Sequence, residues 1–300
     1  MSREAPTVHE VFLASGKSIE EQHELERQFF ARVALTNGTF KTTYPNRLDD
    51  INEAFYPHLL RLADRPIRIM DVGASSGIST VEWYAYLSRS GIDCDITGSD
   101  VMVYASLLTF RFTSTVAALV DSKGNVVHFD LFGTGYPRQP SRKLLRPNTL
   151  RTLAAKFLCR VAMMIDANLP LVKSGRTTPE RGVLLKYQTI ALLSRCFANN
   201  NRLRMIEDDL CAENQAALCQ AFDVIRAANV LNLIYFSLDL IGRMLDTLKQ
   251  RLKEGGLLII ARTHPSGENN ASIFQLSNSQ FVLIDRFGKG SEIEHVVSGR

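Results

Sequence analysis

The chain has 300 residues, 45% of them hydrophobic, so it can bury a sizeable core, and this composition excludes a largely disordered protein. The net charge of +4 at pH 7 is modest but unevenly distributed. Residues 131–179 contain nine Arg or Lys and one acid, which leaves the rest of the chain at −4. The basic character therefore belongs to one segment.

Cysteine usage and hydropathy exclude two further classes of protein. The cysteines form neither a Cys-x-x-Cys pair nor a zinc-ligand pattern, which predicts free thiols and no metal site. They are Cys94, Cys159, Cys196, Cys211 and Cys219. The most apolar window, residues 153–172, is interrupted by charged residues and a proline, so we expect no transmembrane segment. The polar first residues lack a signal-peptide pattern, and we expect a cytoplasmic protein.

The N-terminal part of the chain has a helical pattern. Apolar residues recur at helical spacing in two runs, Val11–Val33 and Ile51–Leu60. The stretch at residues 42–46, which includes Pro45, separates the two runs. We therefore expect residues 1–64 to form an N-terminal helical extension.

From residue 65 the pattern alternates between strands and helices. Ile67–Val72 is a short apolar run that stops at a glycine, which is typical of a buried strand, and Ile78–Ser88 has helical spacing. Ile92–Asp100 predicts a second strand that ends on an acid. Val116–Leu119 and Val126–Phe129 predict a hairpin.

The alternation continues to the C-terminus. We expect strands at Leu203–Ile206, Phe222–Ala228 and Leu257–Ala261, a helix at Ser237–Lys253, and closing antiparallel strands at Ser272–Leu276, Phe281–Asp285 and Ile293–Val297. This pattern predicts an α/β fold with a Rossmann-like, doubly wound, mostly parallel sheet, helices on both faces and an antiparallel C-terminal strand pair. We expect residues 65–300 to form this domain, with a basic, largely helical insertion at about residues 133–200.

A glycine-rich segment follows the first strand, where doubly wound folds bind their ligands. Its sequence is Asp71-Val72-Gly73-Ala74-Ser75-Ser76-Gly77. Glycines let a ligand approach the backbone, and the N-terminus of the next helix presents unpaired N–H groups. The acid followed by this loop resembles the first motif of class I S-adenosylmethionine-dependent methyltransferases. The resemblance implies S-adenosylmethionine as the cofactor.

The resemblance extends through the sheet, leaving out the basic insertion. Asp100 ends the second strand, where the family places an acid that accepts both ribose hydroxyls. Asp208 or Asp209 stands in the place of the acid beside the adenine amino group, and the sequence does not choose between them. The cofactor-binding residues that the resemblance implies are Asp71, Gly73, Ala74, Ser75, Gly77, Asp100, Asp208, Asp209 and Asn229.

A narrower likeness links the chain to the chemotaxis-receptor methyltransferases, which esterify glutamates. It rests on Phe222–Ile225, Asn229–Leu231 and Ile234–Phe236. The paired glutamates that this subfamily carries after its first motif are replaced by Ile78 and Ser79. The likeness therefore does not transfer that subfamily's methyl acceptor to this chain.

Three residues are the candidates for the catalytic, acceptor-binding side. Methyl transfer is an in-line displacement, so the protein mainly has to align donor and acceptor at about 3 Å in a dry pocket. Asn229 follows the fourth strand, His264 follows the fifth, and Tyr235 can orient a substrate through its hydroxyl. A hydroxyl or amine acceptor would use a base, whereas a carboxylate needs none. We expect O- or N-methylation of a small-molecule or protein acceptor, carboxylates included.

Two other interpretations fit the same residues. Residues 73–77 also match the Gly-x-Ser-x-Gly nucleophile elbow of serine hydrolases, with Ser75 as nucleophile and Asp223 and His264 downstream in triad order. The helical pattern before Pro66 and the lack of a His-Gly-Gly-Gly-type segment disfavour it. A protein that binds S-adenosylmethionine without catalysis is the other alternative.

The basic segment has several interpretations of its own. It can be the solvated face of amphipathic helices, a lid that recognises an anionic substrate, or a surface for nucleic acid or anionic lipid. No aromatic-rich stacking pattern accompanies the charges, which disfavours nucleic acid. The sequence leaves the oligomeric state open.

Overall fold

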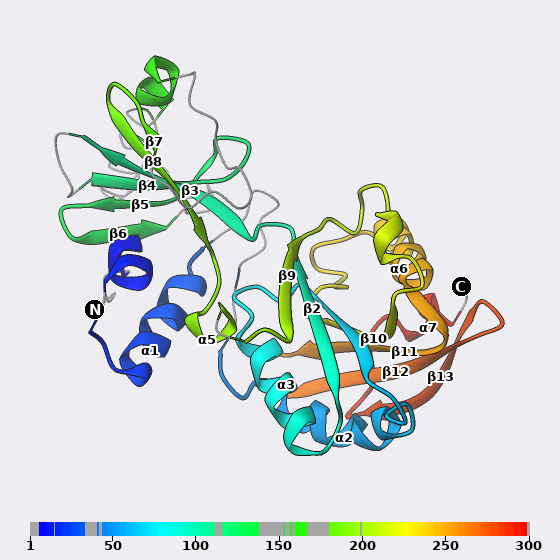
Figure 1. The fold of residues 1–300 in the computed structure, drawn as a ribbon. Helices are drawn as coiled ribbons and strands as arrows, with labels where there is room; N and C mark the ends of the chain where they lie inside the picture. The colour runs from blue at the N-terminus through cyan, green and yellow to red at the C-terminus, as the bar shows by residue number, and fades with distance from the viewer. Residues whose placement is uncertain are drawn as a thin grey trace. The chain divides into compact units, whose positions relative to one another are not determined.

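The chain divides into two compact units, each assembled from two separate stretches of sequence. A computed structural model describes residues 6–14, 16–33, 41, 44–111, 116–137, 153, 157, 160–166, 180–198 and 200–298. Unit 1 combines residues 1–43 with 104–194, and unit 2 combines residues 44–103 with 195–300 (Figure 1). We describe each unit by itself.

The described residues of unit 2 form a seven-stranded sheet in the order β13-β12-β11-β10-β1-β2-β9. The five strands from β11 to β9 are parallel. Their bounds are β1 (Ile67–Val72), β2 (Cys94–Asp100), β9 (Leu203–Glu207), β10 (Phe222–Ala228) and β11 (Leu252–Thr263). Numbered along unit 2, these strands have the spatial order 3-2-1-4-5 of a Rossmann-like, doubly wound fold. The predicted fold class is confirmed.

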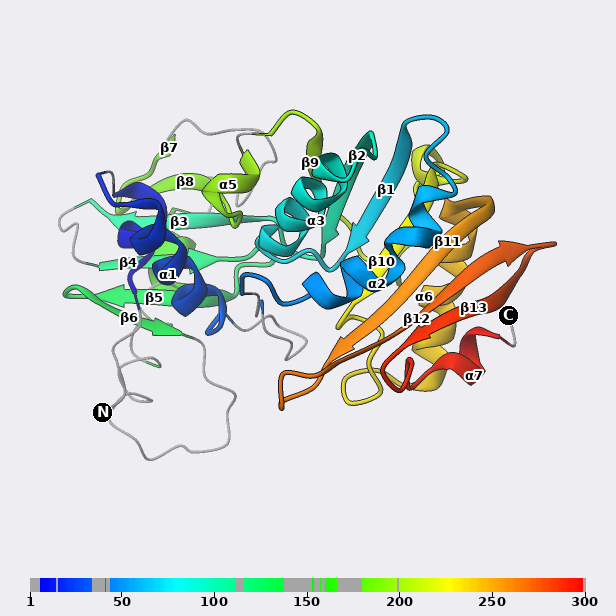
Figure 2. The ribbon, with the colours of Figure 1, turned by 90° about the horizontal axis from the view of Figure 1, so that it is seen from below.

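Helices cover both faces of this sheet. On one face α2 (Asp49–Leu60) contacts α3 (Ile78–Arg89), which packs on β2. On the other face α6 (Leu238–Arg251) packs on β11 and on the short helix α7 (Glu294–Val297) (Figure 2). The Ser237 hydroxyl caps α6 by accepting a hydrogen bond from the Leu240 backbone, which satisfies one of the N–H groups that the first helical turn leaves unpaired. Both layers therefore follow from the amphipathic patterns of the sequence.

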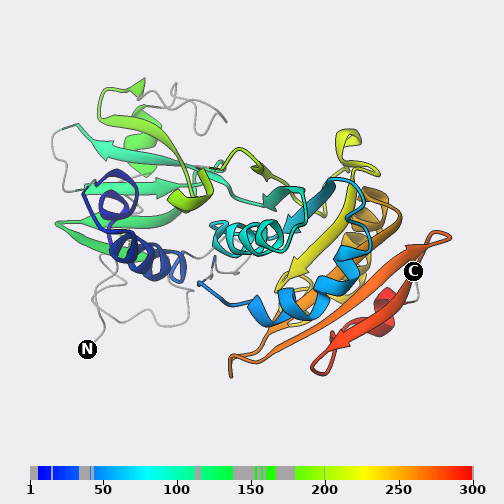
Figure 3. The same ribbon diagram turned by 60° about the horizontal axis from the view of Figure 1, so that its bottom comes forward.

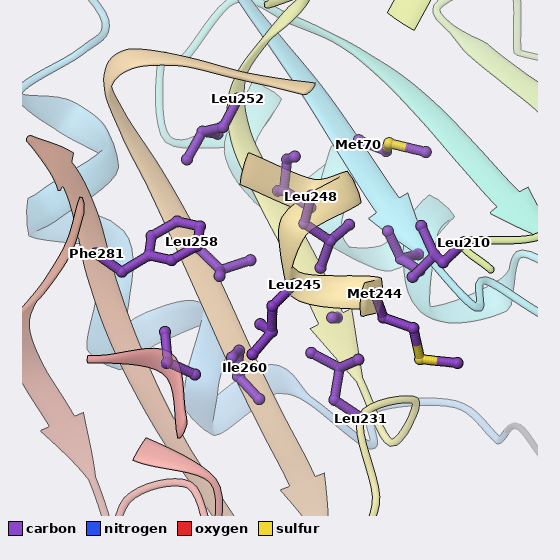
Figure 4. Packing of buried hydrophobic residues seen from close by; sticks show 14 of the residues in the cluster. Met70, Leu210, Leu231, Met244, Leu245, Leu248, Leu252, Leu258, Ile260 and Phe281 are labelled. Atoms are coloured by element: carbon purple, nitrogen blue, oxygen red, sulfur yellow. The ribbon is translucent and has the colours of Figure 1, made fainter. Parts of the chain in front are cut away.

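The core of unit 2 lies between α6 and the sheet. Leu245 and Leu248 of α6 are fully buried among Met70, Leu258 and Ile260 of the strands (Figure 4). Burying a leucine side chain contributes roughly 1.5–3 kcal/mol, so this row holds α6 firmly on the sheet. The strands are thereby held in register, and their carboxyl ends are fixed at one edge.

The C-terminal strands extend the sheet in the antiparallel direction. β12 (Asn269–Ser277) pairs with β11, and β13 (Gln280–Phe287) pairs with β12 at the outer edge of the sheet (Figure 3). The strand expected at Ile293–Val297 is instead the helix α7. Ile293 and Val297 are buried beside α6 because residues four apart share a helix face. An apolar run this short does not distinguish a strand from a helix.

The described residues of unit 1 form a six-stranded antiparallel sheet in the order β6-β5-β4-β3-β8-β7. The bounds are β3 (Tyr104–Phe110), β4 (Val116–Val120), β5 (Val126–Leu131), β6 (Thr134–Pro137), β7 (Glu180–Arg181) and β8 (Leu185–Ala191). The predicted hairpin is β4–β5, and Asp121 closes its turn by accepting hydrogen bonds from the backbone of Lys123 and Asn125. The hairpin therefore belongs to this sheet and not to the Rossmann-like one.

The N-terminal helices pack on the sheet of unit 1. They are a π-helical turn, η1 (His9–Leu13), and α1 (Ile19–Phe30), whose first turn is closed by a capping box between Ser18 and Glu21. The ring centroid of Phe29 lies 4.8 Å from that of the buried His128 on β5. These helices are therefore part of unit 1.

The division into units differs from the domains that the sequence predicts. Residues 1–43 separate from residues 44–64, and the insertion begins at Tyr104 and not near residue 133. Its described part is mainly β-strand. β3 is buried at four consecutive positions, so it lacks the alternation that identifies a half-buried strand. Most of the segment expected to be helical, including residues 138–152 and 167–179, lies outside the described residues.

None of the described helices combines the length and apolar composition that a bilayer crossing requires.

Candidate functional site

The predicted site residues follow strands that end at one edge of the unit 2 sheet, which we call the rim. The parallel strands end there at Val72, Asp100, Glu207, Ala228 and Thr263. The strand order reverses between β1 and β10, which pair directly. Doubly wound folds bind ligands outside the carboxyl ends of the strands at such a reversal. The loop at residues 73–77 and Asn229 lie at the ends of these two strands.

The loop at residues 73–77 turns at three residues with positive φ. These are Gly73 (67°), Ser75 (60°) and Gly77 (83°). A side chain at residue 73 would collide with Val230, and one at residue 77 would collide with the ring of Phe197. Glycine is required at both positions because the backbone passes too close to these neighbours for a Cβ atom. Ser75 takes a conformation that L-residues rarely adopt, as residues at functional sites often do.

Asp100 lies directly against this loop. One of its carboxylate oxygens accepts a hydrogen bond from the Ser75 backbone nitrogen at 2.9 Å, and the other accepts one from the Met102 backbone nitrogen at 3.1 Å. The side chain is buried at the end of β2. The structure thus brings together the acid and the glycine-rich loop that the sequence places 25 residues apart.

Asp71 has a different environment from Asp100. Its carboxylate accepts hydrogen bonds from the Arg226 guanidinium at 2.9 and 2.7 Å and from the Thr80 hydroxyl at 2.6 Å. Arg226 is 1% exposed and lies over the ring of Trp83, 3.9 Å from its centroid. Asp71 is therefore held on the sheet face that α2 and α3 cover, beneath the start of the loop.

Sequence reasoning missed Arg226 as part of the site. The signal was present, because Arg226 interrupts the apolar run at residues 224–228, and every position of this strand is buried. A buried guanidinium requires a carboxylate partner. Which of the acids on neighbouring strands supplies it cannot be read from local pattern.

The structure separates the two acids that the sequence could not choose between. The side chain of Asp208 is 3% exposed, and its carboxylate accepts two hydrogen bonds from the guanidinium of Arg251, at 2.6 and 2.9 Å. Asp209 is exposed, and one of its oxygens accepts a hydrogen bond from the backbone of Cys211. Asp208 is therefore engaged inside the fold, and Asp209 faces solvent after β9.

The candidates for the acceptor side lie after β10 and β11. Asn229 has a left-handed conformation with a φ of 61°, and its side chain exchanges two hydrogen bonds with Thr263, at 2.8 and 3.3 Å. His264 follows Thr263, is half-buried and opens the turn to β12. The structure thus brings Asn229 and His264 to neighbouring positions on the rim. Tyr235 lies on an exposed turn before α6.

The geometry excludes Asp223 as the acid of a serine hydrolase triad with Ser75 and His264. Asp223 lies at the N-terminal end of β10, where Arg65 and Lys253 donate to its carboxylate at 2.6 and 2.9 Å. At about 3.3 Å per residue, β10 separates Asp223 from the rim by about 16 Å. Asp223 therefore cannot orient His264 for attack by Ser75.

Among the residues that the structure describes, no three His, Cys, Asp or Glu side chains gather as metal ligands would.

Comparisons with known proteins return similar solved structures. No protein-family model matches the sequence, and no curated protein matches it. The N-methyltransferase NodS from Bradyrhizobium japonicum, in complex with S-adenosyl-L-homocysteine, aligns at 14% identity over 80% of this chain and 74% of its own, with a TM-score of 0.31. A putative S-adenosyl-L-methionine-dependent methyltransferase from Methanococcus maripaludis aligns at 10% identity over 83% of this chain and 67% of its own, with a TM-score of 0.31.

The [4+2]-cyclase SpnF also aligns, at 13% identity over 70% of this chain with a TM-score of 0.29, and this chain spans 44% of its length. At such TM-scores the alignments assign neither activity nor substrate. Strand order, parallel pairing and the loop after β1 carry the assignment instead. On these grounds unit 2 is a Rossmann-like domain.

Proposed function

We propose that unit 2 binds S-adenosylmethionine at the rim and transfers its methyl group to an acceptor. The contact between Asp100 and the Ser75 backbone carries this proposal. It joins an acid at the end of the second strand to a glycine-rich loop after the first, beside the reversal of strand order. A nucleoside that presents vicinal hydroxyls to the acid would lie along the loop.

The donor and acceptor groups on the rim fit this cofactor. The Asp100 carboxylate already accepts hydrogen bonds from two backbone N–H groups at the rim, which fix its orientation beside the loop. We assign the ribose hydroxyls of the cofactor to this oriented carboxylate. Asp209 is the acid we assign to the adenine amino group, because Arg251 engages Asp208. Gly73, Ala74, Ser75 and Gly77 supply the backbone of the cradle.

Asp71 acts in this proposal as a positioning residue. Arg226 and Thr80 hold both of its oxygens, so it does not contact the cofactor in our assignment. It fixes the end of β1 against β10 and α3. The loop therefore starts from a rigid point, which reduces the entropy lost on binding.

The chain's own residues have to position the acceptor and exclude water. The bound cofactor supplies an electrophilic methyl group on a sulfonium. Asn229 is held to Thr263 by two hydrogen bonds and fixes the end of β10. His264 can accept a proton from a hydroxyl or amine acceptor, and a carboxylate acceptor would need no such base. Tyr235, on the turn between β10 and α6, can donate a hydrogen bond to the substrate.

The proposed acceptor is a small molecule or a protein that presents oxygen or nitrogen. The experiment that tests methyl transfer uses S-adenosylmethionine labelled in its methyl group with a panel of carboxylate, hydroxyl and amine acceptors. Label transfer that is lost in His264→Ala for hydroxyls and kept for carboxylates would support the role of His264. Cofactor binding without transfer to any acceptor would contradict the catalytic part of the proposal.

Binding itself is tested by titration calorimetry with S-adenosylhomocysteine. Asp100→Asn keeps an oxygen that can accept from Ser75 but removes the negative charge. Because hydrogen bonds to a charged group contribute about 1.5–3 kcal/mol, we expect its Kd to rise roughly 10- to 100-fold. Asp95→Asn is the matched control, on the same strand but exposed and away from the rim. An unchanged Kd in Asp100→Asn would overturn the assignment.

A further inference from the structure

Unit 1 exposes a row of apolar side chains that the proposed function does not use. Phe157, Met164 and Ile165 are 67%, 77% and 55% exposed, and Leu153 and Val161 are exposed as well. All five residues are helical in the structure. They recur three, four or eight residues apart, as residues on one helix face do. We call these five residues the apolar stripe.

The opposite side of this helix is anchored to the unit 1 sheet. Ala162 is buried in the cluster that contains Leu108 and Leu185. The Asp166 carboxylate, at the end of the helix, accepts hydrogen bonds from the backbone nitrogens of residues 183–185 at 2.7–3.1 Å. The helix is therefore fixed by one face, and the apolar stripe is its outward face. Val183, on the turn that Asp166 holds, is also 66% exposed.

Exposed basic residues accompany the apolar stripe on the elements that the structure describes. In sequence, residues 131–179 contain nine Arg or Lys and one acid, Asp166, whose buried carboxylate accepts three backbone hydrogen bonds. Arg160, on the same helix, is exposed. Arg181 and Lys186, which pair across the β7–β8 hairpin that Asp166 holds, are exposed too. Among the described residues, the helix of the stripe and the hairpin that Asp166 holds thus expose three basic side chains.

We propose that the apolar stripe docks unit 1 on the surface of an anionic phospholipid bilayer. An amphipathic helix with a basic border lies in the plane of the interface, with its apolar side chains at the boundary between headgroups and acyl chains. Arginine binds lipid phosphates through bidentate hydrogen bonds. The stripe is mainly aliphatic, which suits acyl chains and offers little stacking surface for nucleic-acid bases.

The test is co-sedimentation of the full-length protein with vesicles of two compositions. One is phosphatidylcholine alone, and the other contains about 30% phosphatidylserine. We expect binding to the anionic vesicles and little to the neutral ones. The triple variant Phe157→Ser, Met164→Ser, Ile165→Ser should lower the partition coefficient for the anionic vesicles at least about tenfold. Phe132→Ser, which removes a 76% exposed side chain from the β5–β6 turn, is the matched control and should bind like the wild type.

A second variant tests the electrostatic part. Arg160→Glu should weaken binding to anionic vesicles by about an order of magnitude, and raised salt should weaken the wild type in the same way. Circular dichroism confirms that the variants are folded. Three results would overturn the proposal: no binding to anionic vesicles, an unaffected triple variant, or light scattering that shows the triple variant splitting a dimer into monomers. The last result would mean that a second copy of the chain covers the stripe.

Discussion

The guanidinium of Arg226 holds both carboxylate oxygens of Asp71 from the neighbouring strand, at 2.9 and 2.7 Å. It also donates to the Ser79 carbonyl and to the Asn52 side chain. The pair thereby connects β1 and β10 with α3 and α2 beneath the glycine-rich loop. The loop that carries the proposed function therefore rests on a buried ion pair.

Arg226→Met should lower the free energy of unfolding by about 3–5 kcal/mol, because the Asp71 carboxylate would stay buried without its cation. Urea denaturation followed by circular dichroism measures the change. Arg286→Met is the matched control, since it removes the half-exposed partner of Glu294. Its loss should be less than about 1 kcal/mol. An equal decrease in the free energy of unfolding in the two variants would show that the buried pair stabilises the fold no more than the exposed one.

Gly73→Ala should weaken S-adenosylhomocysteine binding at least about tenfold, because the new methyl group meets Val230 and a left-handed alanine costs roughly 1–2 kcal/mol. Val230→Ala alone should bind almost normally. The double variant should recover the part of the loss that comes from the collision and keep the part that comes from φ. A double-mutant cycle by calorimetry separates the two. A double variant no better than Gly73→Ala would mean that the contact with Val230 is irrelevant.

Asp208→Asn and Asp209→Asn should have opposite effects. Asp208→Asn should lower the free energy of unfolding by about 3–5 kcal/mol, because the buried Arg251 guanidinium keeps Asn214 as a hydrogen-bond acceptor but loses the anion that balances its charge. Asp209→Asn should change stability by less than about 0.5 kcal/mol but raise the Kd for S-adenosylhomocysteine about tenfold. Thermal unfolding and calorimetry on the same preparations measure both. A normal Kd in Asp209→Asn would remove it from the cofactor site.

Asp223 should make unit 2 sensitive to acid. Burial alone would raise the pKa of Asp223, but hydrogen bonds from Arg65, the Arg68 backbone and Lys253 together hold this pKa below its ordinary value of 3.8. A carboxylate with a lowered pKa in the folded state stabilises the fold above its ordinary pKa. That contribution is lost as the pH falls from 3.8 towards the folded value.

Asp223→Asn should therefore be less stable than the wild type at neutral pH and should lose less stability below about pH 4. Urea denaturation at a series of pH values measures both slopes. The exposed Asp64 supplies the control, and Asp64→Asn should retain the wild-type dependence. Parallel curves for Asp223→Asn and the wild type would show that Asp223 does not contribute to acid sensitivity.

The rim could be predicted from the sequence because its signals are local. Ile67–Val72 stops at a glycine and Ile92–Asp100 stops at an acid, and each pattern is contained in about ten residues. Parallel strands then place their carboxyl ends at one edge, so local signals translate into a shared site. The loop and Asp100 meet there as expected.

The features that the sequence does not predict depend on residues that are distant from one another along the chain. Asp71 and Arg226 are 155 residues apart, and nothing near either one shows that they pair. The choice between Asp208 and Asp209 depends likewise on Arg251, on a helix that follows much later. The sheet of unit 1 was missed because β3 is buried on both faces and no glycine or proline marks its start.

Each unit closes only when a second stretch of chain joins the first, and this sets an order for synthesis on the ribosome. Unit 1 has all its residues once residue 194 has left the exit tunnel, whereas unit 2 still lacks β9, β10 and β11 at that point. The strands β1 and β2 then have α2 and α3 for one face, but the face that α6 covers stays open until residues 195–251 emerge. A nascent chain from which residue 194 has just emerged would therefore contain every residue of unit 1 but only the first part of unit 2.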